Sequence, residues 1–358
     1  DHRDLHSFPT RRSSDLLDNV KSRISFLKYD VAKREWIKDG EEKEAKVRGA
    51  SLSAIDANES DQYWFTSNSF LTPSRLCMGN ADDGIAGIAK AHDAPIKSLK
   101  SQFDSTGLEE RQGEAISKDG TVVPYFIIRK SDPNCAERKT PQPTLMFGYG
   151  GFEVSLTPSY TAVTGKAWLE QGGVFVYTNI RGGGEFGPAW HQAALKEKRN
   201  KAYEDFIAIA EHLIATGVTT KELLGIRGGS NGGLLMGNML VQRPDLFGAV
   251  VCAVPLLDMK RYSHLLAGAS WMAEYGNPDT PDWDYMKQYS AYHNIARDAA
   301  QHYPPMLMTS STRDDRVHPY HARSFVKRLH ELGVENTLYY ENMEGGHGGA
   351  ADSKQQAF

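Results

Sequence analysis

The sequence predicts an α/β protein in which a mostly parallel, doubly wound sheet follows an all-β segment. After Gly113, short apolar runs alternate with stretches of helical periodicity, the pattern of a parallel sheet with helices on both faces. From about Leu17 to Phe103 the pattern is instead short alternating runs between turn residues, which indicates antiparallel strands. A chain of 358 residues has room for one large domain or two unequal ones.

The N-terminal part divides into two segments. Residues 1–16 are polar, rich in Arg and Ser, and lack the apolar stretch of a secretory signal. They resemble a translated sequencing adapter, so we exclude them from the fold prediction. Over residues 17–112 we expect strands at Arg23–Tyr29 and Gln62–Thr66, with a turn at Asp39-Gly40 between them. One or two blades of a β-propeller would have this spacing, so we interpret the segment as a remnant of an all-β propeller.

The second domain is expected over residues 113–358. A polar, Pro-containing loop is predicted at Ser131–Pro143. Because the chain stops at Phe358 soon after a Gly-rich loop, we expect its closing C-terminal helix to be missing and the chain to be a fragment of a longer protein. The predicted strands are Thr121–Arg129, Leu145–Tyr149, Val174–Asn179, Leu223–Ile226, Ala249–Val254, Met306–Thr309 and Thr337–Tyr340. The predicted helices are Ala202–Ala215, Asn231–Gln242 and His321–Leu332.

Composition argues against several classes of function. With 41 basic and 45 acidic residues the formal charge is −4, whereas a nucleic-acid-binding protein usually has a basic excess. The cysteines Cys77, Cys135 and Cys252 are odd in number and far apart, which is typical of plain thiols in a reducing compartment. No apolar run approaches the 18 residues of a membrane span. We therefore expect a cytoplasmic protein (a periplasmic one is also compatible), monomeric at full length, with no cofactor and no metal.

The strongest chemical motif is G-G-S-N-G-G at Gly228–Gly233, which contains G-x-S-x-G. It lies between a predicted strand and a predicted helix, the context of a nucleophile elbow. Such a turn strains the serine backbone, so its neighbours must lack Cβ atoms, and the helix N-terminus can stabilise negative charge. The alternative is a Gly-rich turn with an incidental serine.

The order of residues favours the catalytic interpretation. An α/β-hydrolase places its serine first, then an acid, then a histidine. After the strand at 306–309, the loop T-R-D-D-R-V-H-P offers Asp314 or Asp315, and after the strand at 337–340, M-E-G-G-H-G-G offers His347. Each candidate follows the carboxyl end of a parallel strand, where open α/β sheets place their sites. His347 would act as general base towards Ser230, and the acid would orient the imidazole. Asp258 is a second candidate for the acid, although a helix N-cap explains it better.

Two further patterns are weak signals for dinucleotide binding and for metal binding. G-x-G-x-x-G at Gly182, Gly184 and Gly187 follows a strand, but Pro188 and the helical setting of Glu204 and Asp205 favour a structural turn over dinucleotide binding. His318 and His321 lack a third metal ligand.

From about Thr121 onwards the chain resembles the catalytic domain of the prolyl oligopeptidase family of serine peptidases. The motifs that carry the resemblance are F-G-Y-G-G-F (Phe147–Phe152), N-I-R-G-G-G-E-F-G (Asn179–Gly187), G-G-S-N-G-G-L-L (Gly228–Leu235), Q-R-P-D-L-F-G (Gln242–Gly248), D-D-R-V (Asp314–Val317) and G-G-H-G (Gly345–Gly348). The resemblance implies an α/β-hydrolase domain paired with a propeller, of which this chain would keep only the last part.

The resemblance also implies roles for individual residues. It favours Asp314 over Asp315 as the acid, and it assigns the oxyanion hole to the Tyr149 hydroxyl and the Asn231 backbone N–H. Arg316 would bind a peptide carbonyl, and the ring of Trp271 would stack on proline. The remaining pocket walls would be Phe152, Leu256, Tyr275 and Val317.

The expected activity is therefore hydrolysis of short peptides on the carboxyl side of proline, through an acyl-enzyme. The elbow sequence G-G-S-N-G-G argues against oligopeptidase B, which usually carries G-R-S-A-G-G. The alternatives are a family peptidase or esterase with another specificity, and an inactive fragment that only binds peptides.

Overall fold

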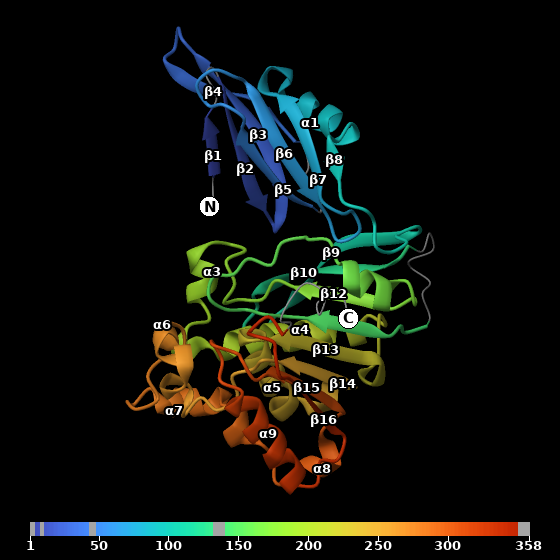
Figure 1. Ribbon diagram of the computed structural model, residues 1–358, viewed down its shortest axis with the longest axis vertical. Helices are drawn as coiled ribbons and strands as arrows, with labels where there is room; N and C mark the ends of the chain where they lie inside the picture. The colour runs from blue at the N-terminus through green and yellow to red at the C-terminus, as the bar shows by residue number, and fades with distance from the viewer. Residues whose placement is uncertain (1–3, 8–10, 43–47, 132–139, 350–358) are drawn as a thin grey trace.

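A computed structural model describes residues 4–7, 11–42, 48–131 and 140–349, and it has two parts (Figure 1). An N-terminal part holds two small antiparallel sheets, drawn in blue at the top of the figure. The second part is built on one eight-stranded sheet, on which the candidate site lies. Among the described residues, no helix combines the length and apolar character needed to cross a membrane.

The two N-terminal sheets have four strands each. The first contains β1 (Asp4–Ser7), β2 (Arg11–Asp18), β3 (Lys21–Asp30) and β4 (Glu35–Glu41). The second contains β5 (Gly49–Ala54), β6 (Gln62–Asn68), β7 (Arg75–Asn80) and β8 (Lys97–Ser98). Alternate residues of β3 and β6, including Ile24, Phe26, Tyr63 and Phe65, face one shared apolar cluster. This alternation explains why the sequence predicted both strands.

The structure differs from the sequence prediction at three places in this part. Residues 11–16 of the excluded segment belong to strand β2, which pairs with β3. Asp39-Gly40 is not a turn but part of β4, where Gly40 (φ +148°) pairs with Phe26 and Asp39 is the extra residue of a β-bulge. The chain turns at residues 31–34 instead. Helix α1 (Gly84–Asp93) was not expected, because two glycines weaken its helical pattern, yet Ile88 and Ala91 bury one side of it.

The central sheet has the order β16-β15-β14-β13-β11-β12-β10-β9. Strands β11 to β16 are all parallel to one another, and β10 pairs antiparallel with both β12 and β9. We had not predicted β9, a largely half-exposed edge strand that starts before residue 113. The strands are β9 (Leu108–Ile116), β10 (Val122–Lys130), β11 (Thr144–Phe147), β12 (Val174–Thr178), β13 (Leu224–Gly229), β14 (Ala249–Ala253), β15 (Met306–Ser311) and β16 (Thr337–Asn342).

Apolar clusters cover both faces of this sheet. On β10, Tyr125 and Ile127 join the larger cluster, whereas Phe126 and Ile128 join a second one on the opposite face. Helices α4 (Asn200–Ala215), α5 (Asn231–Gln242) and α9 (Tyr320–Glu331) contribute to the larger cluster. The second cluster includes Val20, Phe70 and Phe103, so the N-terminal part is anchored on that face. The doubly wound α/β class is confirmed. Most of the predicted loop Ser131–Pro143 lies outside the described residues.

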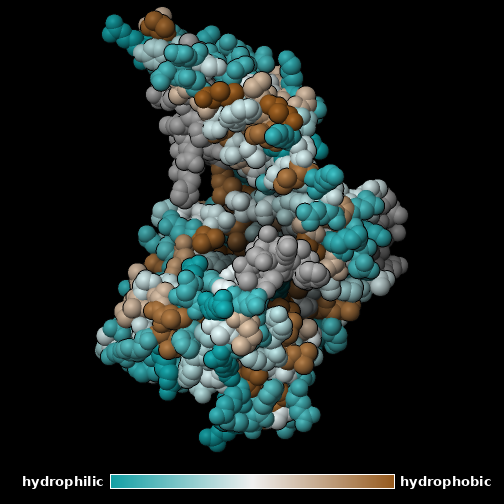
Figure 2. Space-filling view, viewed as in Figure 1, coloured by the Kyte–Doolittle hydropathy of each residue, from teal (hydrophilic) through white to brown (hydrophobic). Residues whose placement is uncertain are grey.

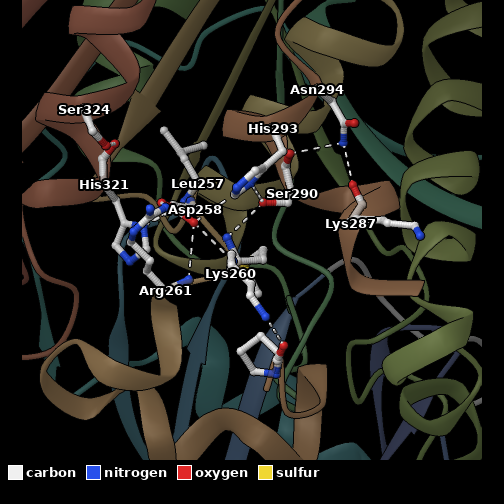
Figure 3. A network of polar contacts seen from close by, with 12 residues as sticks. Leu257, Asp258, Lys260, Arg261, Lys287, Ser290, His293, Asn294, His321 and Ser324 are labelled. Atoms are coloured by element: carbon white, nitrogen blue, oxygen red, sulfur yellow. Dashed lines mark hydrogen bonds and ion pairs between the residues drawn. The ribbon is translucent and has the colours of Figure 1, made fainter. Parts of the chain in front are cut away.

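His321, in the first turn of α9, is a buried histidine whose Nδ1 atom is held as a hydrogen-bond acceptor. Its side chain is buried, and Nδ1 accepts hydrogen bonds from the backbone N–H groups of Leu257 (3.3 Å) and Asp258 (3.1 Å), as Figure 3 shows. Burial lowers the pKa of His321 to about 4, because imidazolium in this position would lose its hydration. The His318 Nδ1 atom likewise accepts from the backbone, at Tyr320.

We expect the unfolded state to bind a proton at residue 321 below its ordinary pKa near 6.5, and the folded state only below about 4. Stability therefore rises with pH across this window, and His321 should cost about 3 kcal/mol of unfolding free energy between pH 7 and pH 4. His321→Asn keeps an acceptor near the same place but does not titrate. Urea unfolding at both pH values should show a smaller acid loss in the variant, and an unchanged loss would contradict this assignment.

Candidate active site

Ser230 lies in a sharp turn between β13 and α5. Its backbone is held at φ +58° and ψ −118°, a region that residues other than glycine rarely adopt. The Ser230 N–H donates to the Ala253 carbonyl (2.9 Å), and the Ser230 carbonyl accepts from Gly233 and Leu234 at the start of α5. A Cβ atom on Gly228 would lie 2.4 Å from the Gly232 oxygen, and one on Gly232 would lie 2.6 Å from the Gly148 oxygen. The turn therefore requires both glycines.

Asp314 and His347 form a hydrogen-bonded pair. They follow β15 and β16, and Nδ1 of His347 lies 2.8 Å from Oδ2 of Asp314. The other carboxylate oxygen accepts from the backbone N–H groups of Arg316 and Val317, both at 2.9 Å. Burial alone would raise the pKa of Asp314, but the hydrogen bonds from His347 and these two N–H groups outweigh it and lower the pKa. Asp315 is exposed.

This pairing defines the chemistry available at the imidazole. An ionised Asp314 can only accept, so Nδ1 of His347 carries a proton, and in the neutral imidazole Nε2 then has the lone pair. No hydrogen bond joins Ser230 to His347 among the described residues, although both follow strands that end at the same edge of the sheet. Contacts between nucleophile and base are often long in unliganded sites and tighten when substrate binds.

Two hydrogen-bond donors flank Ser230. Asn231 begins α5, so its backbone N–H is one of the free donors of a helix N-terminus. Tyr149 follows β11, and its hydroxyl lies within hydrogen-bonding reach of the Ser230 side chain. Burial outweighs that contact and raises the pKa of the phenol, so Tyr149 stays protonated at neutral pH and can donate.

Two of the expected pocket residues contact residues of this centre, since the Tyr275 hydroxyl donates to Asn231 and the Val317 N–H donates to Asp314. The Phe152 and Tyr275 rings meet edge to face at 5.6 Å, and Leu256 and Val317 are buried. Trp271 packs on the main core but stays partly exposed just before α6 (Met272–Tyr275). Arg316 is exposed, and it lies near enough to the Tyr149 phenol for its positive charge to oppose the rise in the pKa of Tyr149.

Three residues that the sequence analysis did not single out lie directly behind the site. Arg199 is fully buried, Glu274 nearly so, and His191 contacts Glu274 at 2.7 Å. Arg199 belongs to the charged run K-E-K-R-N-K, which has the composition of a solvated surface segment. Glu274 lies inside the motif that supplied Trp271 and Tyr275, so its position in S-W-M-A-E-Y-G was the available signal.

Two alternatives raised by the sequence have other roles here. Asp258 is buried and accepts from the Lys260 and Arg261 N–H groups and the Arg261 side chain, so it caps a turn (Figure 3). In the G-x-G-x-x-G loop, the Gly182 Cα comes so close to the Gly150 carbonyl that a Cβ would lie 2.4 Å from its oxygen. This loop therefore supports the segment that carries Tyr149 and Phe152.

Comparison with known proteins identifies the family of the chain. The sequence profile described as the prolyl oligopeptidase family matches residues 159–358, more than half of the chain. The chain belongs to the prolyl oligopeptidase family. It is 44% identical over 344 residues to an uncharacterized peptidase of Sinorhizobium fredii, covering 96% of this chain and 45% of that protein. It is 34% identical to the prolyl endopeptidase of Dictyostelium discoideum, covering 95% of this chain and 46% of that one.

Solved structures of family members share the fold. A post-proline cleaving enzyme from Rickettsia typhi superposes with a TM-score of 0.85 at 35% identity, covering 99% of this chain and 49% of that one. The chain thus spans about half the length of the relatives that it matches. This family likeness, together with the strand order, confirms an α/β-hydrolase sheet preceded by part of a propeller.

We expect Ser230→Ala to abolish turnover of a chromogenic peptide amide, because the variant keeps the Cβ that the turn accepts but loses the nucleophile. Asp314→Asn should lower kcat by about 10⁴-fold, since an amide favours the wrong imidazole tautomer. Asp258→Asn is the matched control and should keep kcat, because Asp258 serves a turn. A loss of turnover in Asp258→Asn that equals the loss in Asp314→Asn would move the acid to Asp258.

Proposed function

We propose that this protein hydrolyses short peptides on the carboxyl side of proline, with Ser230, His347 and Asp314 as its catalytic triad. The observation that carries the proposal is the partly buried 2.8 Å pair between Asp314 and His347, at the sheet edge where Ser230 occupies a strained elbow. Membership of a peptidase family supports peptides as the substrate class.

The chemistry follows from the protonation states. Ser230 Oγ attacks the carbonyl carbon of the scissile bond while His347 Nε2 takes the hydroxyl proton. The tetrahedral oxyanion accepts hydrogen bonds from the Tyr149 hydroxyl and the Asn231 N–H. The C–N bond then breaks, and His347 returns the proton to the leaving amine. Water deacylates the serine ester by the same steps, with His347 again as base, and releases the carboxylic acid.

Proline preference is supported by the apolar walls next to the site. The Phe152 and Tyr275 rings pack edge to face, Leu256 and Val317 are buried, and Trp271, four residues before Tyr275, keeps a partly exposed ring. A pyrrolidine ring is compact and apolar, so it gains contact area on such surfaces. Two curated relatives carry the description prolyl endopeptidase at 34% identity, whereas the relative at 44% identity has no stated specificity.

We expect Trp271→Ala to weaken proline substrates selectively, because ring stacking contributes roughly 1–2 kcal/mol. The ratio of kcat/KM for a proline over an alanine substrate should fall about tenfold. Arg316→Ala is the contrasting variant, which should lower kcat/KM for both substrates alike because every peptide offers a carbonyl. Equal losses for both substrates in Trp271→Ala would rule out stacking as the source of selectivity.

A further inference from the structure

A buried ion pair lies beneath the candidate oxyanion hole. Arg199 has no exposed surface and Glu274 is 4% exposed, and Nη1 of Arg199 donates to Oε1 of Glu274 at 3.0 Å. The guanidinium also lies over the Tyr203 and Tyr275 rings, at 5.9 and 5.4 Å from their centres. Arg199 precedes α4 and Glu274 belongs to α6, so the pair joins two segments that are distant in sequence.

Each partner also holds a backbone or side-chain group of the site. Glu274 Oε1 accepts the Phe152 N–H at 2.9 Å. Arg199 Nη2 donates to Oδ1 of Asn231 at 2.5 Å, and Nδ2 of Asn231 donates to the Tyr149 carbonyl at 2.6 Å. One ion pair therefore connects Phe152 with the two residues that carry the proposed oxyanion donors, Tyr149 and Asn231.

Three further contacts fix the orientation of this network. The Tyr275 hydroxyl donates to the same Asn231 oxygen at 2.7 Å, so the Asn231 amide has its oxygen turned to two donors and its nitrogen turned to an acceptor. His191 Nε2 lies 2.7 Å from the second oxygen of Glu274. A Cβ on Gly151 would lie 2.5 Å from Nδ2 of Asn231, so the main chain packs directly on the network.

The loop held in this way has a strained backbone. Phe152 and Glu153 are consecutive non-glycine residues with φ of +55° and +56°. Such conformations persist only where the surroundings determine them, and they gather at functional sites. The Phe152 N–H is fixed by Glu274 at this strained position, and Tyr149 lies three residues earlier.

We propose that Arg199 and Glu274 are positioning residues that hold the Tyr149 hydroxyl and the Asn231 N–H at the distance and angle the oxyanion requires. This inference rests on the function proposed above. Neither residue contacts the reacting atoms, so their effect is on the geometry of the two donors. A donor displaced from an oxyanion hole loses its stabilisation of the transition state, and the rate of serine acylation or phosphonylation falls.

The test is the second-order rate at which a fluorophosphonate labels the full chain. Ser230 Oγ gives its proton to His347 and bonds to phosphorus as fluoride leaves, while the phosphoryl oxygen occupies the oxyanion hole, so the rate reports that hole. Glu274→Gln and Arg199→Lys should lower this rate at least tenfold. The matched controls are Glu42→Gln and Arg48→Lys, which disturb another ion pair (2.6 Å) that lies between the N-terminal sheets, where Glu42 also accepts the Ile24 N–H. The controls should keep the labelling rate within twofold while lowering the urea unfolding midpoint.

A double variant separates positioning from stability. Replacing a buried ion pair by apolar residues of similar volume is often neutral for folding. Arg199→Met combined with Glu274→Leu removes both charges together and should therefore remain folded, with an unfolding midpoint lowered only by the lost bonds to Phe152 and Asn231. Its labelling should fall at least tenfold.

A labelling rate within twofold of wild type in the folded double variant would overturn the inference. So would an equal fall in the controls. Labelling of Ser230→Ala at the wild-type rate would instead overturn the proposed function, and this inference with it.

Discussion

The strained turn at Ser230 is the constraint on which the rest of the site depends. The sharp turn at φ +58° between a strand and a helix brings backbone segments so close together that the residues two positions before and two positions after the serine must lack Cβ atoms. Gly228 and Gly232 meet that requirement, and they also bring the β13 and α5 backbones against the Gly148 carbonyl at the end of β11. The elbow therefore fixes the β11 loop as well as the serine, and that loop carries Tyr149.

The parallel strands of the sheet bring the remaining residues of the site to the same side as Ser230. Strands β11, β13, β15 and β16 end at one edge, so the loops after them present Tyr149, Ser230, Asp314 and His347 on the same side of the molecule. Buried polar groups then orient these loops. Asp314 is held by two backbone N–H groups and His347, whereas the loop at Tyr149 is held through Asn231, Arg199 and Glu274. Such buried charges favour a single arrangement, because either one left unpaired would be costly.

Much of this could be predicted from the sequence, where the local signal and the tertiary outcome agree. The helix at Asn231–Gln242 has the predicted bounds, because the elbow glycines and an apolar run mark its start and length. Helix α1 and the strand through Asp39-Gly40 were missed, because glycine is a turn signal that here accommodates a helix and a bulge. Arg199 could not be found from sequence, since a charged run normally lies in solvent and only tertiary packing buries this member of it. Asp314 was chosen over Asp315 through family resemblance, and burial distinguishes the two in the structure.

The most direct test of the account is to identify the residue that becomes acylated. The protein would be mixed with an activated ester of an N-blocked peptide ending in proline, quenched in acid within one turnover, digested and mapped by mass spectrometry. The account predicts an acyl group that ends in proline, attached to Ser230, and the adduct should disappear as product forms. Turnover of the ester with the acyl group on another residue, or with no covalent adduct at any time, would contradict it.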